Sequence, residues 1–339
     1  MNVKKRDAGY CNIKLVLIFL VVFGHMIEGQ IDNHPFFMQS YRVIYSVHMP
    51  LFLFLSGLFI KNGTDCMRQM KQMFLLYGCC QLPIVIIRRL LGAECSHLTP
   101  FWHLWYLLSM ACMAGIGGIW FLLISKYPKL NKVWVKAGIV VGAVLAGCFA
   151  GNCPYIGRTL SLSRTICFLP YFLMGIFLSK DMEWKRLRPL GAIALCIYFM
   201  LFLVRGQWIP VQFLYHADSF EQQKQIISEV FMQGTTTRLL CYILGITLGL
   251  FLLTFITERR FPFTKVGAYT LEIYLLHAPL VRLCEKIEAE ERIWFIIAPV
   301  VTVYIILFLY KAFQWRHPLY AVLCHRTLLS QKRLRYFFK

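Results

Sequence analysis

Residues 13–25 are IKLVLIFLVVFGH, and after a short polar link residues 45–59 are YSVHMPLFLFLSGLF. Both stretches are typical of membrane-spanning helices, yet each carries a histidine, His25 in the first and His48 in the second. Ionisable groups at membrane depth are costly and usually face a bundle interior or a cavity. The two stretches therefore predict a membrane protein in which His25 and His48 are candidate functional residues.

The composition supports an integral membrane protein. Of the 339 residues, 58% are hydrophobic and 15% charged, whereas soluble proteins are about 45–50% apolar and about 25% charged. The net charge is +20, but the Lys and Arg residues cluster between apolar segments, which is the positive-inside pattern of membrane proteins. We therefore expect a lipid bilayer and no nucleic acid around this chain.

Apolar runs long enough to cross a membrane occur about ten times. A spanning helix needs roughly 17–25 residues, whereas a barrel strand needs only about 9–11 alternating ones. We therefore predict an all-α polytopic membrane protein with about ten transmembrane helices, near residues 11–29, 42–60, 70–90, 101–124, 133–150, 164–179, 189–204, 237–256, 266–284 and 292–312.

The links between these runs predict the topology and the domain organisation. Most of the 36 Lys and Arg residues fall in links on one side, which predicts that both termini lie in the cytoplasm (N-in/C-in). No internal repeat or soluble segment interrupts the pattern, so residues 1–339 are predicted to form a single integral-membrane domain without a fused soluble domain. The thirteen cysteines lack metal-type spacing, and no metal site is predicted.

The two histidines are expected at similar depth. With a rise of 1.5 Å per residue, His25 lies roughly 7–8 Å below the outer end of its helix, and His48 roughly 9 Å below the outer end of the next. Pro50 removes a backbone donor close to His48 and can open a polar niche. Glu28 follows His25 by three residues, on the same helical face, where it either orients the imidazole or is only solvated.

Further polar and aromatic residues are expected at this outer level: Trp105, Arg158, Arg164 and His277. Their convergence predicts a functional cavity. Two simpler interpretations stand beside it: a single intramembrane histidine often bonds a neighbouring helix, and a tryptophan at the end of a span often anchors it at the interface.

Two links carry other signals. Arg68 and Lys71 lie three residues apart after the second span, so they form either a phosphate-binding patch or an ordinary positive-inside signal. The long link at residues 205–236 is either a cover for an acceptor or a plain surface helix. The basic, aromatic tail after Trp315 is expected to rest on anionic lipid head groups.

Several of these segments together resemble a known family. In chain order they are IKLVLIFLVVFGH, SVHMPLFLFLSGLF, HLWYLLSM, FLPYFLMGIFL and TLEIYLLHAPL. They look like the membrane acyltransferase-3 family, and most like its sugar O-acetylases typified by fucose 4-O-acetylase. The important histidine of the family's GH motif falls on His25, and that of its HMP motif on His48. The family's paired arginines fall near Arg68, but position 72 is Gln72 here, with Lys71 the nearest basic residue.

The resemblance implies a multi-pass enzyme of the bacterial inner (plasma) membrane that O-acetylates a surface glycan or its lipid-linked precursor. Acetyl-CoA would be the co-substrate, with no bound cofactor and with Arg68 and Lys71 as donor-binding residues.

The mechanism expected on this basis uses His25, with His48 or Glu28, as catalytic residues acting on a sugar hydroxyl. Trp105, Arg158, Arg164 and His277 are the expected substrate-binding residues. Direct transfer and an acetyl-imidazole intermediate both remain open. So does a different class of function, a transporter or flippase for a glycan or lipid-linked intermediate, although transporters often show repeated halves and none is evident.

Overall fold

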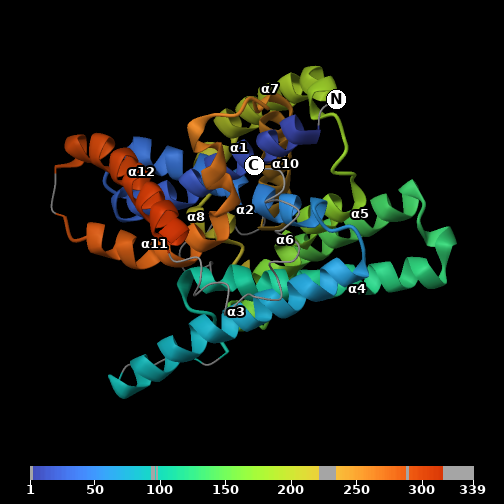
Figure 1. Ribbon diagram of the computed structural model, residues 1–339, viewed down its shortest axis with the longest axis horizontal. Helices are drawn as coiled ribbons and strands as arrows, with labels where there is room; N and C mark the ends of the chain where they lie inside the picture. Colours follow the sequence, from blue (N-terminus) through green and yellow to red (C-terminus); the bar gives the residue numbers. More distant parts are fainter. Residues whose placement is uncertain (1–2, 93–95, 97, 221–233, 288–289, 316–339) are drawn as a thin grey trace. The chain divides into compact units, whose positions relative to one another are not determined.

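The computed structural model describes residues 3–92, 96, 98–220, 234–287 and 290–315. Every regular element that these residues form is a helix (Figure 1). The α-helices are α1 (Val3–Ile27), α2 (Pro35–Leu58), α3 (Gly63–Leu90), α4 (Trp105–Lys126), α5 (Val133–Ala150), α6 (Leu162–Phe177), α7 (Arg188–Val204), α8 (Val211–Tyr215), α10 (Gly234–Phe255), α11 (Thr270–Cys284) and α12 (Glu291–Trp315).

Short 3-10 helices join or precede many of the longer ones. They are η1 (Glu28–Gln30), η2 (Trp102–Leu104), η3 (Pro128–Leu130), η4 (Thr159–Ser161), η5 (Trp184–Leu187), η6 (Gly206–Trp208) and η8 (Pro262–Ala268). The predicted all-α class is confirmed.

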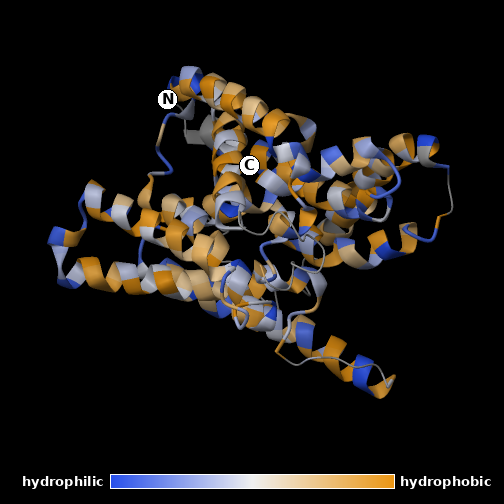
Figure 2. Cartoon of the chain, turned by 180° about the vertical axis from the view of Figure 1, so that it is seen from behind, coloured by the Kyte–Doolittle hydropathy of each residue, from blue (hydrophilic) through white to orange (hydrophobic). Residues whose placement is uncertain are grey.

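Within the described residues, nine helices are long and apolar enough to cross a membrane, namely α1 to α7, α10 and α12. They coincide with nine of the ten predicted spans. Figure 2 shows that these helices are mainly hydrophobic along their length, with hydrophilic residues gathered at ends and turns. The protein is therefore a polytopic, multi-pass α-helical membrane protein.

The span predicted at residues 266–284 differs from the other nine. It divides into the end of η8 and the 15-residue helix α11. Fifteen residues rise about 22 Å, less than the roughly 30 Å of a hydrocarbon core. The 3-10 segment packs tightly on α1: a Cβ on Gly267 would lie 2.0 Å from the Cys11 carbonyl oxygen. The N-in/C-in topology depends on whether α11 crosses, and it stays a prediction.

The chain divides into two compact units, Met1–Ile44 with Phe255–Lys339, and Tyr45–Thr254. In the first unit, α1 packs against η8, α11 and α12. Its side chain at Asn12 is buried and fully used: the amide donates to the carbonyls of Thr257 and Arg259 at 2.8 and 2.9 Å, and its oxygen accepts from the Thr264 hydroxyl at 2.7 Å. A polar residue inside a membrane helix requires such internal partners, and here they fix residues 257–264 on α1.

In the second unit, α3 packs on α4, α5 on α6, and α4 on α6. Helices α2 and α6 approach each other closely. A Cβ on Gly57 would lie 2.2 Å from the Phe172 carbonyl oxygen, and a Cβ on Gly175 would lie 2.1 Å from that of Phe54. Small residues allow such backbone contact in membranes. The crossing fixes the helices that carry His48 and Arg164.

We predict that Gly57→Ala destabilises the protein by about 1–3 kcal/mol, because the added methyl group must separate two backbones. Thermal unfolding of the purified protein in detergent measures the loss. Gly142→Ala on α5 is the matched control, because nothing lies within 4 Å of its added Cβ. An unfolding temperature for Gly57→Ala as high as that of Gly142→Ala would contradict the close crossing.

Candidate functional site

His25 and Glu28 meet at the end of α1. His25 lies in the last turn of this helix and Glu28 opens η1, so the i, i+3 spacing brings the two side chains together. His25 Nδ1 lies 3.1 Å from Glu28 Oε2, and the side chains are 13% and 34% exposed. The structure thus pairs the predicted catalytic imidazole with a carboxylate that retains access to solvent.

His277 completes what we call the histidine cluster, formed by His25, Glu28 and His277. The packing of α1 on α11 stacks the His25 and His277 rings, with centroids 5.3 Å apart. His277 is fully buried, and its Nδ1 lies 2.7 Å from the Tyr274 carbonyl oxygen. A carbonyl only accepts hydrogen bonds, so this contact holds the proton of His277 on Nδ1. Because His277 is completely buried, it is better suited to position His25 than to contact a substrate.

The second unit holds a separate group of predicted site residues. His48 is buried, and its ring contacts Tyr45 edge-on with centroids 4.7 Å apart. Tyr45 in turn contacts the ring of Tyr215 at 5.4 Å. His25 belongs to the first unit and His48 to the second, and their expected meeting stays a prediction.

Arg164 and Trp105 extend this group. The Arg164 guanidinium lies 4.8 Å from the centre of the Trp105 ring, and its Nε donates to the Tyr215 carbonyl at 3.2 Å. Trp105 also stacks on Phe168 at 5.4 Å. We call Tyr45, His48, Trp105, Arg164 and Tyr215 the arginine–aromatic cluster. Trp105 is thus part of a packed polar and aromatic group.

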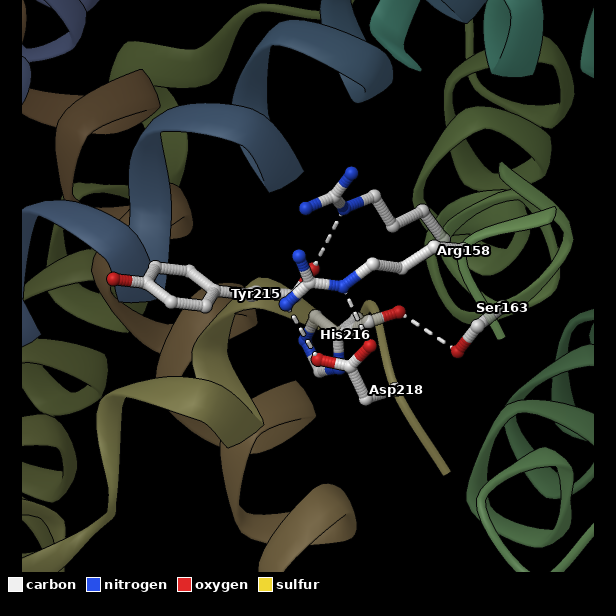
Figure 3. A network of polar contacts seen from close by, with 6 residues as sticks. Arg158, Ser163, Tyr215, His216 and Asp218 are labelled. Carbon is white, nitrogen blue, oxygen red and sulfur yellow. Dashed lines mark hydrogen bonds and ion pairs between the residues drawn. The ribbon is translucent and has the colours of Figure 1, made fainter. Parts of the chain in front are cut away.

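Arg158 is held by an ion pair with Asp218, in the same loop region as Tyr215 of the arginine–aromatic cluster. Its Nε and Nη2 bind the two carboxylate oxygens of Asp218 at 2.7 and 2.9 Å (Figure 3). This hydrogen-bonded carboxylate raises the pKa of Arg158. Asp218 was not predicted as a partner, although it is the only carboxylate in residues 205–220. Arg158 therefore fixes the loop that contains Asp218. Its guanidinium is already engaged by this ion pair, and its predicted role in substrate binding stays a prediction.

The loop after α8 is tied to α6 at a second point. The Ser163 hydroxyl donates to the His216 carbonyl at 2.8 Å (Figure 3). The described part of the long link is thus fastened to α6, whereas residues 221–233, on which its predicted role as a cover partly rests, lie outside the described residues. The basic tail from residue 316 lies outside them as well.

Backbone strain gathers around these ties. Leu160, Ser161 and His216 have φ angles of 51°, 54° and 51°, in a region that residues other than glycine rarely adopt. Buried hydroxyl contacts hold Ser161 there: Ser109 donates to its hydroxyl at 2.9 Å and Thr165 to its carbonyl at 2.8 Å. Strained residues persist where the surroundings over-determine them, and they often mark functional sites.

Arg68 and Lys71 lie in the first turns of α3, and both are exposed. Arg68 Nη1 is 3.5 Å from Asp65 Oδ1, and Asn62 caps the helix by accepting from the Asp65 amide. The positive end of the helix dipole adds to their charge. This part of α3 can attract phosphates, but it is distinct from both clusters in its contacts.

The clusters and the fold together define a multi-pass membrane protein with buried imidazoles at His48 and His277 and a half-buried guanidinium at Arg164. The sequence profile of the acyltransferase-3 family, described as an acyltransferase domain, matches residues 9–311. The chain therefore belongs to this family and is a membrane acyltransferase, and the resemblance predicted from its motifs is confirmed at the family level.

A curated relative agrees with this assignment. The chain is 20% identical over 320 residues to the nodulation protein NolL of Mesorhizobium japonicum, an alignment that covers 85% of this chain and 80% of the relative. No solved structure matches the chain significantly.

His216 gives a prediction for the pH dependence of stability. Burial lowers its pKa well below 6.5, and the charges of Arg238 and Arg164 lower it further. The folded protein therefore binds fewer protons at this residue than the unfolded chain. The contribution of neutral His216 to the free energy of unfolding is therefore fully present above pH 6.5. It decreases as the pH falls below this value, by up to about 1.4 kcal/mol per pH unit.

Thermal unfolding in detergent between pH 7.5 and 5 tests this prediction with His216→Asn, which does not titrate in this range and tolerates a positive φ. We expect a smaller acid-induced loss of stability in this variant than in the wild type. His34→Asn, which removes a histidine near the surface, should behave like the wild type. Equal acid sensitivity of the His216 variant and the wild type would refute the assignment.

Proposed function

We propose that this acyltransferase transfers an acetyl group from acetyl-CoA to a hydroxyl of a cell-surface or exported glycan, with His25 as the general base. The contact between His25 and Glu28 carries the proposal. A carboxylate within hydrogen-bonding distance of an imidazole is the arrangement that other acyl-transfer enzymes use to activate a hydroxyl.

The chemistry follows from the roles of the two ring nitrogens. A hydroxyl that attacks the thioester carbonyl must lose its proton as the new ester bond forms. When the proton on Nδ1 is donated to Glu28, the lone pair of His25 lies on Nε2, where it can accept the hydroxyl proton. The carboxylate then stabilises the imidazolium until the proton passes to the departing thiolate of coenzyme A.

His277 is proposed as a positioning residue. Its ring stacks on His25 and its own orientation is held by the Tyr274 carbonyl. Restriction of the His25 ring by this contact would keep Nε2 directed at one place, and orientation of a catalytic group contributes strongly to rate.

The arginine–aromatic cluster is the proposed location for recognising the sugar. Guanidinium N–H groups donate to hydroxyl and carboxylate oxygens, and aromatic faces pack against the C–H faces of a sugar ring. His48 remains a second catalytic candidate within this cluster. For the donor, Arg68 and Lys71 offer exposed positive charge for the phosphates of coenzyme A.

The proposed location is the inner (plasma) membrane of a bacterium. Acetyl-CoA is made in the cytoplasm, and a multi-pass enzyme in this membrane gives one chain access to the donor on one side and to an exported glycan on the other. The relative from Mesorhizobium japonicum is a bacterial protein, which is consistent with this setting.

We predict that His25→Ala lowers acetyl transfer by roughly 100- to 10,000-fold, the usual contribution of a general base. Glu28→Gln keeps the shape of the side chain but removes its charge, and should lower transfer less. The measurement is transfer of labelled acetyl from acetyl-CoA to candidate glycans by the purified protein in liposomes.

The matched control is His34→Asn, which removes another histidine of the same unit while preserving an acceptor for the Phe36 amide that His34 now binds. It should retain wild-type transfer. Normal transfer by His25→Ala, at equal protein level and monodispersity, would reject the proposed base.

A separate prediction concerns the donor. Replacing both Arg68 and Lys71 by alanine should raise the KM for acetyl-CoA by roughly tenfold while kcat changes little, because the lost charges act on the proposed phosphates and not on the reacting acetyl group. Lys129→Ala, an exposed lysine in η3, serves as the charge control. An unchanged KM in the double variant would place the donor elsewhere.

A further inference from the structure

Arg238 is a fully buried arginine that neither cluster uses. It lies near the start of α10, and its side chain has no exposed surface. One end of the guanidinium is held: Nη1 donates to the Gly147 carbonyl at 3.3 Å and contacts the Cys167 sulfur at 3.1 Å. The ring of Phe220 lies 4.7 Å from Cζ. These groups are neutral, so they offset the charge only in part.

The other edge of the guanidinium has no such contacts. Both Nε and Nη2 are buried and have no hydrogen-bond partner among the described residues. A guanidinium stays protonated under all physiological conditions, and a buried charge without a counter-ion is strongly unfavourable. Buried cations in membrane proteins usually pair with an anion or mark a binding site.

The shape of this edge indicates the ligand. Arg158, in the same unit, uses the same two atoms, Nε and Nη2, to bind both oxygens of Asp218. Two parallel N–H groups match the spacing of two oxygens in a carboxylate or a phosphate, and the guanidinium favours this bidentate geometry.

His216 lies close to Arg238 and has a similar feature. Its Nδ1 is also buried without a partner among the described residues, and its ring stacks on Tyr242 with centroids 6.2 Å apart. Tyr242 is itself engaged, because its hydroxyl donates to the Cys167 carbonyl at 2.7 Å. The surroundings of Arg238 therefore contain several fixed polar groups, but none of its contacts with the described residues involves a carboxylate.

We propose that Arg238 binds an oxyanion, a carboxylate or a phosphate group, through Nε and Nη2. The ring of Phe220 lies over a face of the guanidinium, and the anion binds at the edge that carries Nε and Nη2. The ligand is a free anion or the charged group of an acidic sugar. The occupancy of this site is measured without an acyl donor, so the test below does not depend on the proposed acetyl transfer.

The test uses the full-length protein in detergent at constant ionic strength. Thermal unfolding and calorimetric titration are followed with three probes: sodium glucuronate, which carries a carboxylate on a sugar; inorganic phosphate; and neutral glucose. We expect glucuronate, phosphate or both to raise the unfolding temperature, and glucose to leave it unchanged. A response to glucuronate alone assigns the site to a sugar carboxylate, and a response to phosphate assigns it to a phosphate group.

Arg238→Gln should weaken binding of the active anion by roughly 10- to 100-fold, the usual loss when a hydrogen-bonded charge is removed. The exposed Arg205→Gln changes the net charge equally and should bind as the wild type does. Arg238→Lys provides a second variant if Arg238→Gln does not fold, because it keeps the charge but lacks the two-donor edge, and it should also bind more weakly.

Two results would overturn the proposal. The first is that neither anion stabilises the wild type more than glucose does. The second is that the Arg238 variant which folds binds the anion as tightly as the wild type.

Discussion

The contact between Gly57 and Gly175 is the constraint on which the second unit depends. Backbone atoms of α2 and α6 meet there with no room for a side chain on either helix. In a bilayer, helices gain no hydrophobic energy by leaving lipid, so close van der Waals contact between backbones supplies much of their association. Because α2 carries His48 and α6 carries Arg164, the same crossing sets the positions of both ends of the arginine–aromatic cluster.

Several polar groups inside the two units follow one rule, which is that a neighbour fixed through packing holds them. Glu28 holds His25, the Tyr274 carbonyl holds His277, and the Tyr215 carbonyl holds Arg164. Arg238 departs from the rule, with one edge held and the other without a partner in the described part of the chain. Departures of this kind are where a ligand is expected, because buried polar groups otherwise find partners.

The all-α class and most of the membrane spans could be predicted from the sequence, because run length and hydropathy are local properties. Sequence reasoning predicted too long a helix at residues 266–284, because the packing of Gly267 on Cys11 involves residues far apart in the chain. It also placed Glu28 on the helical face of His25 from their spacing, and left open whether the carboxylate orients the imidazole or is only solvated. The pairing of Arg158 with Asp218, and the burial of Arg238, depend on tertiary contacts that no local pattern contains. The roles of His25, His48 and the other proposed site residues remain predictions.

The three hydrogen bonds of Asn12 have a consequence for biosynthesis. Asn12 belongs to α1, whereas its partners Thr257 and Arg259 follow 245 and 247 residues later in the chain. During translation the Asn12 amide therefore lacks these two partners until about 245 further residues have been made. The first unit closes last, and a nascent chain that stalls before residue 257 would expose a polar group that quality-control proteases of the membrane can recognise.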